Sequence, residues 1–274
     1  MFIDSHCHLN FKAFKKDLDQ VLKTARDAGV SEIIIPGAKI DSSRKAIEIA
    51  DKYTGTYAAT GIHPHHAAEF GEYLNNNQKI AELKEKLKDL AVRKKTVAIG
   101  EIGLDHYQYS NYPPIAQDLR QLQLKLFGLQ LDLAVELRKP VILHCRQAHE
   151  VMLGFLEKFL IDNRLSGVFH CFDGTPAQLE KVLSLGFYAG FDGNITYPDN
   201  FRLVETMSKT PLERLLLETD SPFLTPEPFR GSRNTPANLI HTAQFIAASL
   251  KMPVERLARL TSANAVQLFN LSMN

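Results

Sequence analysis

Six side chains that can bind divalent cations stand near the carboxyl ends of five short apolar runs. They are His6, His8, Glu101, His144, His170 and Asp220. Imidazole and carboxylate groups are common protein ligands of Zn²⁺, Mn²⁺ and Co²⁺. One histidine at the end of a strand usually has a structural role, but six donors at one edge of a sheet predict a metal site. Because strand side chains alternate between faces, we expect His6 and His8 to point the same way.

A cysteine directly follows three of these histidines, at Cys7, Cys145 and Cys171. The same alternation turns the thiols away from the metal site, so we expect them to be buried as small apolar side chains and not to act as ligands. No paired CxxC spacing supports a thiolate site. Three cysteines at distant positions also suggest no disulfide framework, as is usual in a reducing compartment.

Short apolar runs alternate with longer stretches of helical periodicity along the whole sequence, which is typical of parallel βαβ units. Eight strands are predicted, at Phe2–His6, Glu32–Ile35, Tyr57–Ile62, Thr96–Glu101, Pro140–His144, Gly167–His170, Phe187–Phe191 and Arg214–Asp220. The clearest helices are predicted at Leu18–Ala28, Ser42–Tyr53, Ile80–Val92 and Ile115–Leu137, with a final pair at Ala237–Leu250 and Pro253–Leu271. The sequence therefore predicts an α/β fold, a TIM-type (β/α)8 barrel with a C-terminal helical extension, whose active site lies at the carboxyl ends of the strands.

The length and composition fit a single domain over residues 1–274. The chain has 45% hydrophobic and 23% charged residues, as ordinary globular proteins do. The first residues lack a basic region followed by a long apolar stretch, and nowhere is there an apolar run of about 18 residues, so we expect an unprocessed cytoplasmic protein with no membrane partner. A formal net charge of +1 means that the molecule as a whole is not basic enough to attract nucleic acid through its overall charge. We interpret the basic clusters at 12–16 and 84–95 as solvated helix faces.

The motifs, taken together, resemble those of the TatD family of metal-dependent deoxyribonucleases, within the amidohydrolase superfamily. The resemblance spans nearly the whole chain. The matching segments are Asp4–Leu9, Gly61–His65, Gly100–Asp105, His144–Arg146, His170–Phe172, Glu218–Pro222, Arg230–Asn234, and Asn264–Ala265 before Leu268–Phe269. Some members of the family lack the first His-x-His, which this sequence keeps.

The resemblance implies a site for two divalent cations, which we expect to be Zn²⁺, Mn²⁺, Mg²⁺ or Co²⁺. It implies that His6 and His8 hold one ion together with Asp220. The other ion would be held by His144 and His170, and Glu101 would bridge the two. Glu101 stands where the superfamily often has a carboxylated lysine, which separates this chain from the amide- and lactone-cleaving branches.

A pair of cations about 4 Å apart lowers the pKa of a bridging water and polarises a phosphoryl oxygen, as cleavage of a phosphodiester requires. We therefore expect a hydroxide that bridges the two metals to be the nucleophile. Asp220 is the expected catalytic base, because a metal-bound carboxylate with one free oxygen can accept the proton of the water and pass it to the leaving oxygen.

Other polar residues of these motifs are candidates for supporting roles. We expect His63, Arg146, Arg230 and Arg233 to contact substrate, although each arginine could equally form a structural ion pair. Asp4 and Glu218 are expected to orient the ligands from a deeper position. Asp105 is either a turn-forming residue or another such acid. The remaining histidines are expected to be exposed or to cap helices: His65, His66, His106, His149 and His241.

The leading functional hypothesis is a metal-dependent phosphodiesterase that resembles TatD-type DNA exonucleases. Its partner would be DNA, as single-stranded or frayed ends that reach the barrel mouth, and the enzyme would act as a monomer. Two alternatives stay open. One keeps the metals but cleaves an ester or amide, such as the aminoacyl ester of a mischarged tRNA or a small cyclic amide. The other is a weakly active metal-binding scaffold for a protein partner.

Overall fold

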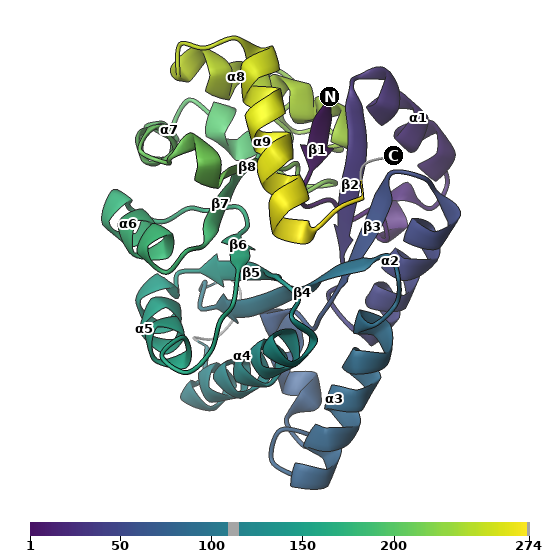
Figure 1. The fold of residues 1–274 in the computed structure, drawn as a ribbon, viewed down its shortest axis with the longest axis vertical. Helices are drawn as coiled ribbons and strands as arrows, with labels where there is room; N and C mark the ends of the chain where they lie inside the picture. Colours follow the sequence, from purple (N-terminus) through teal and green to yellow (C-terminus); the bar gives the residue numbers. More distant parts are fainter. Residues whose placement is uncertain (109–114, 273–274) are drawn as a thin grey trace.

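Eight parallel strands lie side by side in the order of the sequence, with helices around the outside (Figure 1). The computed structural model describes residues 1–108 and 115–272. The strands are β1 (Phe2–Asp4), β2 (Val30–Pro36), β3 (Thr56–Thr60), β4 (Thr96–Asp105), β5 (Val141–Arg146), β6 (Gly167–Phe169), β7 (Tyr188–Phe191) and β8 (Leu215–Leu217). Their strictly parallel pairing confirms the predicted (β/α)8 barrel.

The outer layer consists mainly of amphipathic helices whose apolar faces pack on the strands. They are α1 (Leu18–Asp27), α2 (Ile40–Lys52), α3 (Asn77–Ala91), α4 (Gln117–Leu137), α5 (His149–Phe159), α6 (Pro176–Ser184), α7 (Phe201–Ser208), α8 (Leu239–Ser249) and α9 (Val254–Phe269). In α1, for example, Val21, Leu22 and Ala25 are buried at the spacing of one helical face. The predicted C-terminal helical extension is present as α8 and α9.

One end of the barrel is filled by apolar side chains and is closed by α9. Inward-facing residues from all eight strands form a cluster with the end of α9. Its members include Ile3, Ile34, Ile142 and Leu216 from the strands and Phe269 from the helix. Figure 1 shows α9, in yellow, crossing this end of the sheet. Because this end is packed with hydrocarbon, polar chemistry is left to the opposite end, where the strands finish.

The observed strands differ from the predicted ones mainly at their carboxyl ends. β1 stops at Asp4 and β8 stops at Leu217, so His6, His8 and Asp220 lie in loops rather than on strands. Both strands are shorter than predicted. The residues that follow them form backbone hydrogen bonds with each other, but these bonds do not make a regular ladder. β4, in contrast, continues past Glu101 to Asp105 and pairs with β5 along this extension.

Candidate metal centre

The barrel closes where the segment after β1 meets the segment after β8, and this seam positions three of the six predicted ligands. The Ser5 amide donates to the Leu217 carbonyl at 3.1 Å, and the His8 amide donates to the Ser221 carbonyl at 2.8 Å. Between them, the Asp220 amide donates to the His6 carbonyl at 2.9 Å. Backbone bonds, and not strand alternation, therefore bring His6 and His8 to Asp220 from more than two hundred residues away.

These three side chains form the first group of candidate ligands. The Nε2 atoms of His6 and His8 lie 3.2 Å apart. Asp220 Oδ1 lies 3.6 Å from the His6 Nε2 atom and 3.3 Å from the His8 Nε2 atom. Both histidines are buried, whereas the Asp220 side chain keeps 13% of its surface exposed. The two imidazoles of the group are therefore buried, whereas solvent reaches the Asp220 carboxylate.

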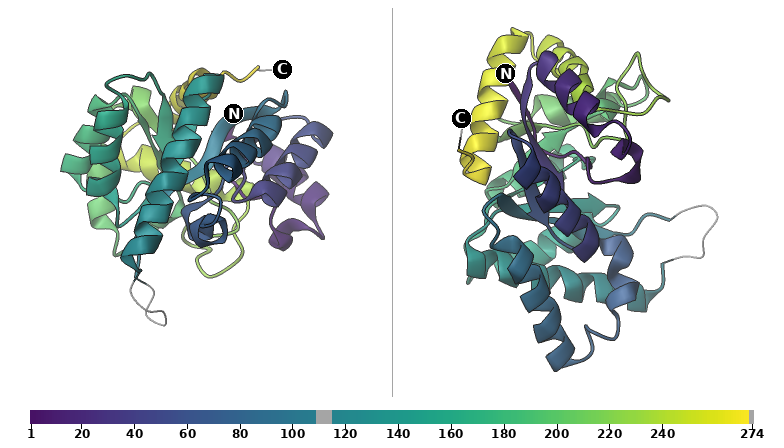
Figure 2. Two further views of the ribbon diagram at one scale, coloured as in Figure 1. Left: turned by 90° about the horizontal axis from the view of Figure 1, so that it is seen from below. Right: turned by 90° about the vertical axis from the view of Figure 1, so that its right-hand side faces the viewer.

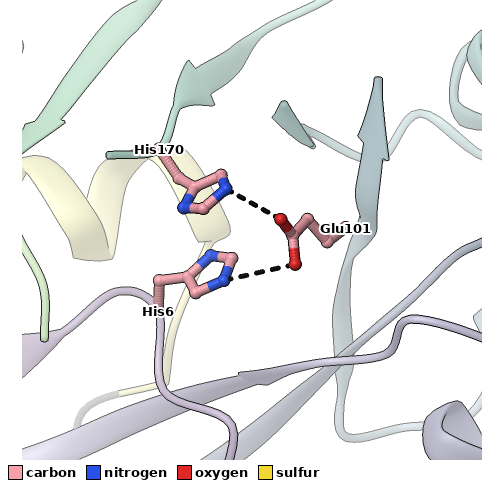
Figure 3. Close-up of side chains that lie close together, drawn as sticks. All are labelled: His6, Glu101 and His170. Carbon is pink, nitrogen blue, oxygen red and sulfur yellow. Dashed lines mark ion pairs between the residues drawn. The ribbon is translucent and has the colours of Figure 1, made fainter. Parts of the chain in front are cut away.

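Glu101, near the middle of β4, places one carboxylate oxygen toward each of two histidine groups. Its Oε1 atom lies 2.8 Å from His170 Nε2 and 3.0 Å from His144 Nδ1. Its Oε2 atom lies 3.5 Å from His6 Nε2 and 3.6 Å from His8 Nε2. Figure 3 shows the carboxylate facing the rings of His6 and His170, which come from different loops. The arrangement suits a carboxylate shared by two cations.

His63, predicted from the sequence to contact substrate, also faces this carboxylate. It follows β3, and its Nε2 atom lies 3.3 Å from Glu101 Oε1. With Glu101 and His144 it forms a further group whose donor atoms all lie within 4.8 Å of one another, as do those of His6, Glu101 and His170. The geometry therefore makes His63 a candidate ligand as well as a candidate substrate contact.

The donor set fits divalent cations on electrostatic grounds. Burial lowers the pKa of His6 to about 4 and that of His63 to about 3, so both imidazoles are neutral and keep a lone pair for a metal. Burial opposes ionisation of Glu101 and Asp220, but the facing histidines lower the pKa of both carboxyls. His144 differs, because Asp105 and Glu101 outweigh its burial and raise its pKa to about 9.

Asp105 holds His144 from the side away from Glu101. Its Oδ2 atom lies 3.2 Å from His144 Nε2 and 2.6 Å from His65 Nε2, while Oδ1 accepts the Tyr107 amide at 2.9 Å. Asp105 thus orients a candidate ligand and also shapes a turn. His65 is exposed, as predicted, but it also lines the cavity above the candidate ligands and contacts Asp105. The buried carboxylate at the end of β4 therefore holds one edge of this exposed loop histidine.

A cavity of about 270 Å³ opens above the candidate ligands at the barrel mouth. Of the three predicted arginines, only Arg146 is among its lining residues, and the Arg146 guanidinium stacks on the Tyr107 ring at 3.6 Å. Arg230 stacks on the Tyr197 ring at 4.0 Å, farther along the proline-rich loop. Arg233 forms an ion pair with Asp17 at 2.5 Å outside this cavity.

Three buried acids lie behind the ligands. Asp4 accepts hydrogen bonds from the Thr219 hydroxyl at 2.7 Å and the Thr219 amide at 3.0 Å, and Glu218 accepts from the Ser5 hydroxyl at 3.1 Å. Sequence reasoning missed the third, Asp192, which follows β7 and is fully buried. Neither of its carboxyl oxygens has a hydrogen-bond partner among the described residues. No motif around Asp192 distinguishes it from an ordinary loop aspartate.

Two minor predictions also need correction. Cys7 and Cys145 are buried as expected, but Cys171 is only partly buried, because its backbone turns at φ +46° to reach Glu218. None of the metal-binding groups found among the described residues includes a cysteine. His149 was expected to be exposed or capping, yet it is buried at the start of α5 and pairs with Asp173 at 3.4 Å.

Comparisons with known proteins agree on one family. The family described as "TatD related DNase" matches residues 3–270. The "uncharacterized metal-dependent hydrolase YabD" of Bacillus subtilis is 34% identical over 272 residues, covering 99% of this chain and 100% of the relative. The "3′-5′ ssDNA/RNA exonuclease TatD" of Escherichia coli K12 is 34% identical over 275 residues, covering 98% and 99%. The crystal structure of YJJV, a TatD homologue from the same organism, matches with a TM-score of 0.86 at 32% identity, covering 99% and 98%. No helix among the described residues is long and apolar enough to cross a membrane.

Proposed function

This chain belongs to the TatD related DNase family and is a metal-dependent hydrolase, and we propose that it cleaves phosphodiester bonds at the ends of single-stranded DNA. The observation that carries the proposal is the position of Glu101, whose two oxygens face two separate histidine groups at the floor of an open cavity. Two relatives described above carry names that specify metal-dependent hydrolysis or single-stranded nucleic acid.

Two divalent cations are proposed to bind here, one held by His6, His8 and Asp220 and the other by His144 and His170, with Glu101 shared between them. His63 is a further candidate ligand of the second ion. Cations at these positions supply a lowered pKa for water and a polarised phosphoryl oxygen. Imidazole-rich ligands favour Zn²⁺, Mn²⁺ or Co²⁺ over Mg²⁺ on grounds of ligand softness.

The chain's own residues are proposed to bind the phosphate and to move the proton. Asp220 is the candidate base, because its partly exposed carboxylate faces the cavity and its lowered pKa keeps it ionised. Arg146, at the cavity wall, is placed to hold a phosphate through paired hydrogen bonds. Asp105 would keep the ring of His144 fixed throughout.

The proposal is tested with purified protein, labelled single-stranded DNA, and Mn²⁺, Mg²⁺, Zn²⁺ or Co²⁺ in separate reactions. We expect cleavage with at least one metal and a loss of about a thousandfold or more in Asp220→Ala, because the variant loses both a ligand and the base. A parallel panel of carboxylic esters and cyclic amides tests the other bond types. Intact DNA with every metal, together with consumption of the panel, would overturn the proposal.

A further inference from the structure

Two phenylalanine rings form one side of the metal cavity. Phe11 stacks on His8 with ring centroids 4.4 Å apart, and Phe223 meets Phe11 edge to face at 6.0 Å. Both rings line the cavity, and the Phe223 side chain keeps half of its surface exposed. Phe11 comes from the loop after β1 and Phe223 from the loop after β8. An exposed aromatic face beside a phosphodiester site can stack against a base of any sequence.

The residues that directly follow Phe11 in the sequence line a second cavity, of about 430 Å³. Its lining residues are Lys12, Ala13, Lys15, Lys16, Asp17 and Arg233. The three lysines are exposed, and among the residues that the structure describes none forms an ion pair. The one carboxylate of the cavity, Asp17, is already paired with Arg233. This basic cavity therefore carries an excess of positive charge that the whole chain, at +1, lacks.

The lysines at 12–16 are exposed to solvent as predicted, but they do not lie on the face of a regular α-helix. Lys12 belongs to the short 3-10 helix η1 (Lys12–Phe14), and Lys15 and Lys16 lie in the turn before α1 begins at Leu18. Arg233, from the loop after β8, donates to the Ala13 carbonyl at 2.5 Å and joins the two loops. The right-hand view of Figure 2 shows both loops on the same side of the barrel.

We propose that the nucleotides outside the metal cavity lie on a track that runs across Phe223 and Phe11 to this basic cavity. This inference rests on the proposed function and adds the binding site for the remainder of the strand. A base would stack on Phe223, and the following phosphates would lie near Lys12, Lys15 and Lys16. Proteins that hold single strands without sequence preference combine aromatic platforms with basic grooves in this way.

The test compares a dinucleotide with a single-stranded 12-mer as substrates of the same protein. The triple variant Lys12→Ala/Lys15→Ala/Lys16→Ala removes the three unpaired charges. Its matched control is Lys94→Ala/Lys158→Ala/Lys251→Ala, which removes three exposed lysines from segments outside both cavities. All six lysines are exposed, and matched melting temperatures of the two variants establish that both are folded.

We expect the unmodified chain to prefer the 12-mer in kcat/KM, and the first triple variant to lose about tenfold or more of that preference. The slope of log KM against log salt for the 12-mer should become shallower by about 2, because single strands give about 0.7 per phosphate contact. The control variant should keep both the preference and the slope. An unchanged preference and slope in the first variant would overturn the track.

The aromatic step has its own variant pair. Phe223→Ala should raise KM for the 12-mer by about tenfold to a hundredfold, the usual range for one lost stacking contact, and Phe223→Tyr should restore it. Equal KM values for Phe223→Ala and the unmodified chain would remove Phe223 from the track. If the unmodified chain cleaves neither substrate, the proposed function fails. If it cleaves both and no variant changes the preference, only the track fails.

Discussion

Two sets of acids stand at or near the carboxyl ends of the barrel strands, and their surroundings shift their pKa values in opposite directions. The front acids, Glu101 and Asp220, face histidines, which lower the pKa of both carboxyls despite burial. The rear acids are Asp4, Asp192 and Glu218. Burial raises the pKa of Asp4 to about 7 and that of Asp192 to about 8, and it also raises that of Glu218, with neighbouring carboxylates adding to the effect.

The comparison shows that the neighbours of a buried acid, and not its burial alone, decide which form it takes. Imidazoles compensate the front acids and leave them ionised, which is the state that binds cations. Asp4 and Glu218 accept hydrogen bonds from neutral groups, such as the hydroxyls of Thr219 and Ser5, and these bonds do not offset the rise in pKa that burial causes. An acid whose pKa is raised carries less negative charge than one whose pKa is lowered, so the rear acids compete less for a cation while they support the ligand loops.

The largest difference between the two sets is expected when one acid of each is replaced by its amide, which has the same shape and no charge. Glu101→Gln should lower kcat/KM by about a thousandfold or more, because the shared ligand is lost. Glu218→Gln replaces a carboxyl whose pKa burial already raises well above its usual value, so its loss should stay within about tenfold. Steady-state kinetics on single-stranded DNA, with metal content measured in parallel, provides the comparison. Equal losses in the two variants would mean that the sets do not differ.

The rear set makes a pH-dependent prediction through Asp192. Its pKa is near 3.8 when unfolded and about 8 when folded, so folding retains a proton between these values. Stability contributed at this site is therefore lost as pH rises from about 4 to about 8. Asp192→Asn removes that loss, so its advantage in free energy of unfolding should grow across this range to about 5 kcal/mol, at about 1.4 kcal/mol for each unit of pKa. Urea denaturation of metal-free protein at several pH values measures it, with the exposed Asp199→Asn as control. A pH-independent difference would contradict the prediction.

A smaller effect is expected at Asp105, which resembles the front acids because two histidines face it. Asp105→Asn should lower metal affinity by about tenfold to a hundredfold, since partners of ligand histidines commonly contribute that much. Asp173→Asn is the matched control, because Asp173 pairs with a histidine outside the cluster. Calorimetric titration with Mn²⁺ distinguishes them. Unchanged affinity in Asp105→Asn would show that His144 needs no such support.

The smallest effect is expected at Ser5, whose hydroxyl contacts the rear acid Glu218. Ser5→Ala removes one neutral hydrogen bond to Glu218 and one to the Leu217 carbonyl. Buried neutral hydrogen bonds contribute about 1 kcal/mol, so a loss of about that size is expected, with kcat/KM changed less than about threefold. Thermal unfolding beside Ser166→Ala, a change at an exposed serine, checks it. A large fall in activity would place Ser5 in the front set.

The fold was predictable because its signals are local and repeated. Alternation of apolar runs with helical periodicity recurs from β1 to β8, and the positions of the strand ends identified the six candidate ligands. Strand alternation predicted the directions of His144 and His170, which lie on or directly after regular strands. The same rule predicted that His6 and His8 point the same way. They do meet at one site, but they lie in a loop that backbone hydrogen bonds to the segment after β8 hold in place.

The features that were missed depend on contacts between loops. Asp192 carries no distinguishing neighbours in the sequence, and the contact of His65 with Asp105 appears only when distant segments meet. The cavity lined by Lys12, Lys15 and Lys16 was not foreseen, because three exposed lysines near a predicted helix look the same in the sequence whether or not a second loop lies beside them. Arg233, on the proline-rich loop, closes that cavity through a contact across more than two hundred residues.

The central claim is that Glu101 stands between two cations, and anomalous scattering from crystals grown with Mn²⁺ tests it most directly. The account predicts two anomalous peaks per chain, one beside His6, His8 and Asp220 and the other beside His144 and His170, with a Glu101 oxygen next to each. A single peak that Glu101 does not touch, or peaks only outside this cluster, would contradict it.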